Sequence, residues 1–368
     1  MAVAQPAPDE PVAIVGFFDY GPAKDGFPGL QNMERAIRAS RVTNRAPLYI
    51  GHYGPNPDAA RILQRAGARY APMFSIQPGD PHRSDYPSVY YRERSFGDAI
   101  SDDQLRELPA AYAGRIPLAT PGKSLPRGNH LEWGIELGRR YRDRLRHARD
   151  GGMSIEGWQF DENLLELEVG VSESQQVLYR RFITGIMRGL FGGRKELDDE
   201  DERGIVWHAI QRKPLRSKPL PLLHATKTRG VSEFWEALDQ ASWRVVGEEY
   251  ARFEGKAEAA AVDWASFQQL LRRQPPLGGD IRRAIGKKYV VGMSPGYHWD
   301  VRRLGGRVYP SWTRKRVNDW RDYYVRVRAT AAPPSGFAQF NFLSGNAKYE
   351  AMLDAFKAVE LGLRVMAR

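Results

Sequence analysis

The sequence predicts a single α/β domain folded as a (β/α)8 (TIM) barrel with elaborated βα loops. Short apolar, β-branched or aromatic runs alternate with helical segments along the chain, the pattern of repeated βα units and a parallel sheet. Acidic, aromatic and amide side chains recur where these runs end. A chain of 368 residues also fits one such barrel with insertions.

Nine runs are candidate strands. They are, in order, Val12–Phe18, Leu48–Tyr53, Tyr70–Ile76, Arg115–Thr120, Ile155–Asp161, Ile205–Ile210, Trp243–Glu248, Tyr289–Ser294 and Phe337–Phe342. Because the barrel needs eight strands, one of the nine is an extra strand, a loop or a misread helix end. The run Arg115–Thr120 is the weakest, since Pro117 lies inside it and proline is poorly tolerated in a central strand.

Apolar residues at three- and four-residue spacing predict the helices. These are Leu30–Ser40, Asp58–Ala66, Ser101–Tyr112, Leu131–Ala148, Ser172–Leu190, Ser232–Gln240, Trp264–Arg273 and Ala347–Met366. Asp58, Ser101 and Ser232 stand in capping positions. We expect residues 1–11 to form a flexible N-terminal segment, residues 12–368 to form the catalytic barrel, and the last helix to close its ring.

The composition excludes several kinds of chemistry. No cysteine occurs, which removes disulfides, thiolate metal sites and cysteine nucleophiles. The usual zinc-site histidine spacings and glycine-rich nucleotide motifs are also missing, so we expect neither a metal nor a cofactor. No run approaches the roughly 18 apolar residues of a membrane helix.

The opening residues bear on location. They lack the basic and apolar regions of a signal peptide. Ala2-Val3-Ala4, followed by a polar stretch rich in proline and alanine, nevertheless resembles the mature end left after signal cleavage. This favours a secreted protein, with a cytoplasmic one as the alternative.

The net charge of +11 favours anionic partners. Many arginines lie on amphipathic helices with acidic residues between them, as in Arg139–Arg146, which is typical of a solvated face. We therefore expect a carbohydrate substrate, an anionic one included, over nucleic acid. The alternative is a basic, non-catalytic binding protein for acidic glycan or nucleic acid, with Lys213–Arg229 or Arg302–Arg328 as its basic stripe.

Two of the candidate strands end in adjacent carboxylates. Asp161 and Glu162 follow Gly157-Trp158-Gln159-Phe160, and Glu248 and Glu249 follow Trp243–Gly247. Glycoside hydrolysis needs one carboxylic acid to protonate the leaving oxygen and one carboxylate to act as nucleophile or base. Because successive strand side chains point to opposite sides, we expect one member of each pair to face the cleft, and either member is a candidate.

Other strand ends carry polar and aromatic residues that we predict to bind substrate. They are Asp19, Tyr20, His52, Tyr53, Trp207, His208, Tyr297, His298, Trp299 and Asn341. In a barrel the carboxyl ends of all strands meet on one face, so these side chains would line one cleft. Flat aromatic faces suit sugar rings, whereas Trp158 and Trp243 are better explained as core residues.

The Trp-x-Phe-Asp-Glu end at 158–162 and the Gly-Glu-Glu-Tyr end at 247–250, set in a βα alternation over residues 12–366, resemble the (β/α)8 glycoside hydrolases as a superfamily. The Asn-Glu signature of many such enzymes is absent, since Glu162 precedes Asn163. The resemblance implies a barrel and acid-based chemistry, hydrolysis or transglycosylation, on a poly- or oligosaccharide.

Overall fold

The structure is a computed structural model. It describes residues 10–18, 28–52, 55–78, 89–93, 117–118, 130–161, 173–191, 203–208, 229–247, 251–252, 287–294, 336–343 and 349–367, together with a few positions between 318 and 329. The predicted helices Ser101–Tyr112 and Trp264–Arg273 lie outside these residues.

Eight of the nine candidate strands form one parallel sheet. Its strands are β1 Val12–Phe18, β2 Leu48–His52, β3 Arg69–Tyr70, β4 Met73–Pro78, β7 Gln159–Asp161, β8 Gly204–His208, β9 Ser242–Gly247, β11 Tyr289–Ser294 and β12 Gly336–Leu343. They are ordered β3-β2-β1-β12-β11-β9-β8-β7-β4, and every neighbouring pair is parallel. The predicted α/β class with a parallel sheet is confirmed.

The first and last strands of this order, β3 and β4, are neighbours in the sequence. β3 pairs with β2 and β4 pairs with β7, and only Ala71 and Pro72 separate β3 from β4. The Ala71 N–H donates to the Ile50 carbonyl at 2.9 Å, and the Gln159 N–H donates to the Pro72 carbonyl at 2.8 Å. The predicted run Tyr70–Ile76 is therefore a single path bonded on both sides, interrupted where proline offers no N–H to the ladder.

Three short strands extend the sheet. β5 Val89–Glu93 pairs antiparallel with β4, and β6 Pro117–Leu118 pairs antiparallel with β5. β10 Ala251–Arg252 pairs with β11. The run around Pro117 is thus the strand that does not belong to the parallel set, as its proline indicated.

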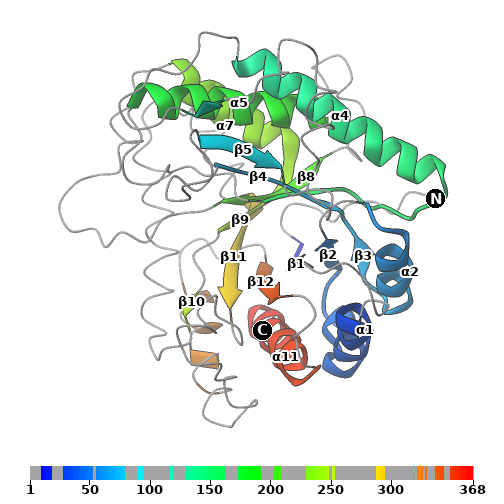
Figure 1. The fold of residues 1–368 in the computed structure, drawn as a ribbon. Helices are drawn as coiled ribbons and strands as arrows, with labels where there is room; N and C mark the ends of the chain where they lie inside the picture. Colours follow the sequence, from blue (N-terminus) through cyan, green and yellow to red (C-terminus); the bar gives the residue numbers. More distant parts are fainter. Residues whose placement is uncertain are drawn as a thin grey trace.

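Helices occur between the parallel strands. They are α1 Pro28–Ser40, α2 Pro57–Arg65, α4 His130–Asp150, α5 Glu173–Phe191, α7 Arg229–Ala241 and α11 Tyr349–Met366. In Figure 1, α4, α5 and α7 are grouped at the top and α1, α2 and α11 at the lower right. Neighbours within each group pack together: α4 on α5, α5 on α7, α1 on α11 and α1 on α2.

Two predicted caps are wrong. The N-cap of α2 is Asn56, whose side chain accepts from the Ala59 N–H at 2.9 Å, and Asp58 lies in the first turn. Pro57 explains the shift, since proline at the first helical position places the cap one residue earlier. Ser232 lies inside α7, which begins at Arg229.

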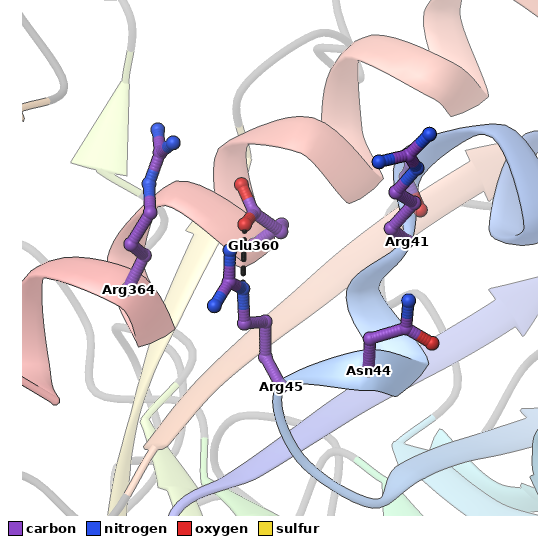
Figure 2. A pocket seen from close by; sticks show the side chains of 6 residues that line it. Arg41, Asn44, Arg45, Glu360 and Arg364 are labelled. Atoms are coloured by element: carbon purple, nitrogen blue, oxygen red, sulfur yellow. Dashed lines mark hydrogen bonds and ion pairs between the residues drawn. The ribbon is translucent and has the colours of Figure 1, made fainter.

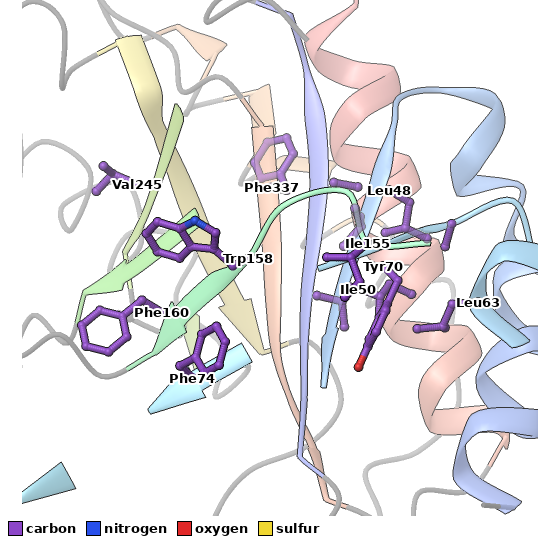
Figure 3. Close-up of a cluster of buried hydrophobic side chains, with 14 of the residues drawn as sticks. Leu48, Ile50, Leu63, Tyr70, Phe74, Ile155, Trp158, Phe160, Val245 and Phe337 are labelled. Carbon is purple, nitrogen blue, oxygen red and sulfur yellow. The ribbon is translucent and has the colours of Figure 1, made fainter. Parts of the chain in front are cut away.

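The parallel strands bury apolar residues on both faces. The inner face carries Val12, Ile14, Tyr49, Ala71, Met73, Trp243, Val246 and Val290. The outer face, covered by helices, carries among others Ala13, Val15, Leu48, Ile50, Phe74, Phe160, Val245 and Phe337. Figure 3 shows two groups of this outer cluster, one around Phe74, Trp158 and Phe160, the other around Ile50, Leu63 and Tyr70. Strands buried on both faces are typical of parallel sheets.

One ring contact shows that the sheet curves strongly. Tyr49 on β2 and Trp243 on β9 meet edge to face with ring centroids 4.8 Å apart. Four steps of the sheet order separate these strands, through β1, β12 and β11. In a flat sheet their backbones would be about 19 Å apart. The inner face therefore wraps round until its opposite parts touch, and Trp243 is a core residue, as is Trp158.

The crossing of α4 and α5 is formed by glycine on both helices. Gly134 and Gly138 of α4 face Gly185 and Gly189 of α5. A Cβ built on any of the four would lie 2.1–2.2 Å from a carbonyl oxygen of the other helix. Spacing of four residues puts each pair on one helix face, which lets the two backbones touch.

Candidate active site

The carboxyl ends of the parallel strands form one edge of the sheet, and several predicted site residues stand there. β2 ends at His52, β7 at Asp161 and β8 at His208. Asn341 lies near the end of β12, where the register with β1 shifts between Gly16 and Phe17. Strands that run in the same direction bring these positions to one end of the domain.

The register of three neighbouring strands places Asp161 relative to the end of β9. Phe160 of β7 pairs with Val206 of β8, which pairs in turn with Val245 of β9. Asp161 is therefore level with Trp207 and Val246, the next residues of β8 and β9. Gly247 ends β9 opposite His208. Glu248 follows Gly247 directly in the sequence.

The structure describes the predicted site only in part. It gives backbone positions for His52, Asp161, Trp207, His208 and Asn341. The remaining candidates lie outside the described residues and stay predictions: Asp19, Tyr20, Tyr53, Glu162, Glu248, Glu249, Tyr297, His298 and Trp299.

Gln159 lies just below this edge and was not among the sequence candidates. It is fully buried on β7, two residues before Asp161. A Cβ on Gly51 of β2 would lie 2.6 Å from its side-chain amide, so the amide occupies the space next to that glycine. Strands β2 and β7 flank the β3–β4 segment, so Gln159 fills the inner face beneath the edge. The glycine at 51, inside a strand, is the only sequence signal for such a close approach.

Among the described residues, the charged groups with perturbed pKa values are Glu156 and Lys288, which lie just before β7 and β11, near the amino ends of the strands. The Tyr49 hydroxyl accepts from Arg69 at 2.6 Å, and Arg69 also pairs with Glu156 at 3.3 Å. Lys288 donates to the Asp239 carboxylate at 2.6 Å, and burial holds the pKa of its ammonium below the ordinary value. These contacts lie at the amino ends of the strands.

Buried Arg244 also lies near the amino end of its strand, β9. Its guanidinium donates to the carbonyls of Trp243 and Glu10 at 2.9 and 2.8 Å, and it lies over the Trp243 ring at 4.7 Å from the centroid. Contacts of this buried cation with two carbonyls and an aromatic face tie β9 to the residues before β1.

Glu156 gives a pH-dependent prediction. Burial raises the pKa of its carboxyl, and Arg69 opposes that shift. Protonation therefore stabilises the folded protein, fully so below the ordinary pKa, and this contribution is lost as pH rises through the raised value. Glu156→Gln, which resembles the protonated form, should raise Tm relative to wild type more at about pH 7 than at about pH 4.

Thermal unfolding across that range checks this expectation. Glu136→Gln is the control, because Glu136 pairs with Arg140 in a partly exposed i,i+4 pair on α4, and loss of such a pair should change Tm only slightly. A Glu156→Gln difference that stays constant or shrinks with rising pH would contradict the prediction.

Within the described ranges, no three His, Asp or Glu side chains lie together in a way that could hold a metal ion. None of the helices in the part of the chain that the structure describes is long and apolar enough to cross a membrane.

Comparison with known proteins gives structural likeness alone. No family model matches the chain, and no curated protein matches it. Among solved structures, the GH99 endo-alpha-mannosidase from Bacteroides thetaiotaomicron aligns with a TM-score of 0.39 and 12% identity, over 89% of this chain and 83% of that one. Its complex with BIS-TRIS-Propane aligns with a TM-score of 0.37 and 12% identity, over 96% of this chain and 95% of that one. The class of these enzymes is the one that the strand-end motifs resemble; at these TM-scores the likeness assigns neither fold nor activity to this chain.

Proposed function

We propose that the chain is a glycoside hydrolase or transglycosylase built on a closed (β/α)8 barrel, with a pair of carboxylates at the C-terminal edge of its strands. The observation that carries the proposal is the register of β7, β8 and β9, which sets Asp161 level with Val246, two residues before Glu248 in the sequence.

Closure of the barrel is supported by the chain's own pairings. The β3–β4 path is bonded to β2 on one side and to β7 on the other, so it counts as one strand of eight. β2 and β9 then stand four strands apart in both directions round the ring. In a closed barrel, side chains from opposite strands fill the interior. The Tyr49–Trp243 contact is of this kind.

The spacing suits a carboxylate pair. β7 and β9 flank β8, so their backbones lie about 10 Å apart. Two carboxyl groups that lean toward each other from such positions fall within the roughly 5–9.5 Å that glycosidases use. At the short end of this range the second group acts as the nucleophile; at the long end it acts as a base on water.

Strand alternation selects one acid from each adjacent pair. Asp161 stands two residues beyond Gln159, which is on the inner face, and Glu248 stands two residues beyond Val246, which is also on the inner face. Since side chains repeat their side every second residue, we propose Asp161 and Glu248 as the catalytic pair. The same alternation favours Trp207, level with Val246, over His208 for a sugar contact.

In the proposed reaction the two carboxyl groups act in different protonation states. One carboxyl stays protonated and gives its proton to the glycosidic oxygen as the bond to the sugar breaks. The other remains ionised and stabilises or attacks the anomeric carbon. Water, or the hydroxyl of a second sugar in transglycosylation, then bonds to the anomeric carbon and gives its proton to a carboxylate. The fully buried Gln159 amide lies below the proposed pair and is uncharged.

A screen of the purified protein against a broad polysaccharide panel, with anionic and bacterial envelope glycans included, tests the proposal. We expect reducing ends or transglycosylated products from at least one glycan. Retention on heparin that collapses at moderate salt, with no product from any glycan, would instead favour the basic binding protein.

A further inference from the structure

We propose that a pocket at the opposite end of the domain binds a small anion that carries a phosphoryl group. The pocket lies between the α1–β2 connection and α11 and is lined by Ser40, Arg41, Asn44, Arg45, Glu360 and Arg364 (Figure 2). This inference is independent of the proposed glycosidase activity.

The pocket has the size of a small-molecule site. Its volume is about 400 Å³, within the range of ligand pockets in proteins. It is contributed by two elements far apart in sequence, the 40–45 segment and α11, which packs on α1. A phosphate ester would occupy more of this volume than inorganic phosphate.

The lining is strongly cationic. Three arginines and one glutamate line the pocket, and the glutamate is already paired, since Arg45 Nε lies 2.8 Å from Glu360 Oε1 (Figure 2). Among the residues described, neither Arg41 nor Arg364 forms an ion pair. Two positive charges therefore remain for a ligand, which matches a phosphoryl dianion. Guanidinium groups bind phosphate oxygens in a forked, charge-assisted geometry.

The backbone of Arg41 supports a binding role for its side chain. Arg41 follows the last residue of α1 with φ 59° and ψ 23°, the left-handed conformation. It is the only non-glycine residue with positive φ in the described part of the chain. Glycine is the residue that most often ends a helix in this conformation, because a Cβ is strained there. A strained residue whose side chain lines a pocket is a candidate for function at that pocket.

The location separates this pocket from the proposed catalytic edge. The 40–45 segment leads from the end of α1 into the start of β2, so it lies at the amino ends of the strands. The carboxylate candidates stand at the carboxyl ends. A ligand here would not compete with a glycan at that edge.

Calorimetric titration with inorganic phosphate and with glucose 6-phosphate tests the proposal on the full chain. We expect both to bind at constant ionic strength, and glucose alone to give no heat. Tighter binding of glucose 6-phosphate would identify a phosphate ester as the ligand, and equal affinity would identify free phosphate. Absence of binding by both would overturn the proposal.

Three variants distinguish a built site from general charge. Arg41→Gly and Arg364→Gln should each weaken binding about 10- to 100-fold, the effect of losing one charge-assisted contact. Arg61→Gln, on the exposed face of α2, should leave affinity unchanged. Arg41→Gly should also raise Tm by about 1–3 °C, because glycine relieves the left-handed strain. Weaker binding in a more stable protein cannot come from unfolding; equal losses in all three variants would overturn the proposal.

Discussion

Asp161→Asn and Glu248→Gln should each lower kcat on the glycan identified by the screen by about 10²- to 10⁴-fold. The amide keeps the shape of the side chain but can neither donate an acidic proton nor carry the negative charge that the oxocarbenium-like transition state needs. A carboxylate at an open cleft serves this transition state more than the fold, so Tm should stay close to that of wild type. Initial rates and thermal unfolding of both variants check the two expectations together.

The adjacent acids are the matched controls. Glu162→Gln and Glu249→Gln change the same chemistry one residue further along, at positions that strand alternation assigns to the other side. They should retain activity within a few fold. If instead all four acids cap helices or pair with arginines, each variant should lose about 0.5–2 kcal/mol of unfolding free energy and keep its activity. Four active enzymes would remove the catalytic assignment of these residues.

The general acid should also appear in the pH dependence. A carboxyl that must stay protonated near its working pH needs a raised pKa, so the alkaline limb of the kcat/KM profile should report it. Removing that acid should abolish the limb along with most of the rate, whereas removing its partner should leave the limb in place.

The parallel sheet could be predicted from the sequence because β-branched and aromatic runs separated by helical patterns leave few topologies open. Eight runs joined the parallel sheet, and Pro117 marked the ninth as the exception. The break between β3 and β4 was not predictable from the run Tyr70–Ile76, because hydrophobicity is continuous there and only the missing N–H of Pro72 interrupts the ladder.

The proposal of Asp161 and Glu248, one from each acid pair, rests on neighbouring residues whose positions come from the structure. From the sequence, Asp161 and Glu162 are equivalent candidates at a strand end. The contact between Gln159 and Gly51 fixes which side of β7 faces inward, and Val246 does the same for β9. Burial alone would not have decided this, because both faces of the sheet are apolar.

The crossing of α4 and α5 was also beyond the sequence patterns considered. Gly134 and Gly138 interrupt a helix rich in arginine, and Gly185 and Gly189 interrupt one rich in apolar residues. Glycine lowers helix stability by about 1 kcal/mol relative to alanine. From the sequence, each of these four glycines is therefore expected only to destabilise its own helix. Their function is visible only when the two helices are placed together.

Gly138→Ala and Gly185→Ala should each therefore destabilise the protein, by about 3 kcal/mol or more in unfolding free energy. Intrinsic propensity alone predicts the opposite sign, a gain of about 1 kcal/mol. The added Cβ, however, would lie 2.2 Å from the Ile186 carbonyl oxygen in one variant and 2.2 Å from the Leu131 carbonyl oxygen in the other. Backbone atoms cannot rotate away as a side chain can, so the helices must separate and lose packing along the whole crossing.

Urea unfolding measures this effect, and Gly151→Ala is its control. Gly151 directly follows α4, and its added Cβ would meet only ordinary contacts, the nearest at 3.4 Å. Its variant should change the unfolding free energy by less than about 1 kcal/mol. Because α4 leads into β7 and α5 leads into β8, separated helices should also disturb the strand ends that carry Asp161 and Trp207. Gly138→Ala or Gly185→Ala with wild-type stability would mean that the two helices do not cross at these glycines.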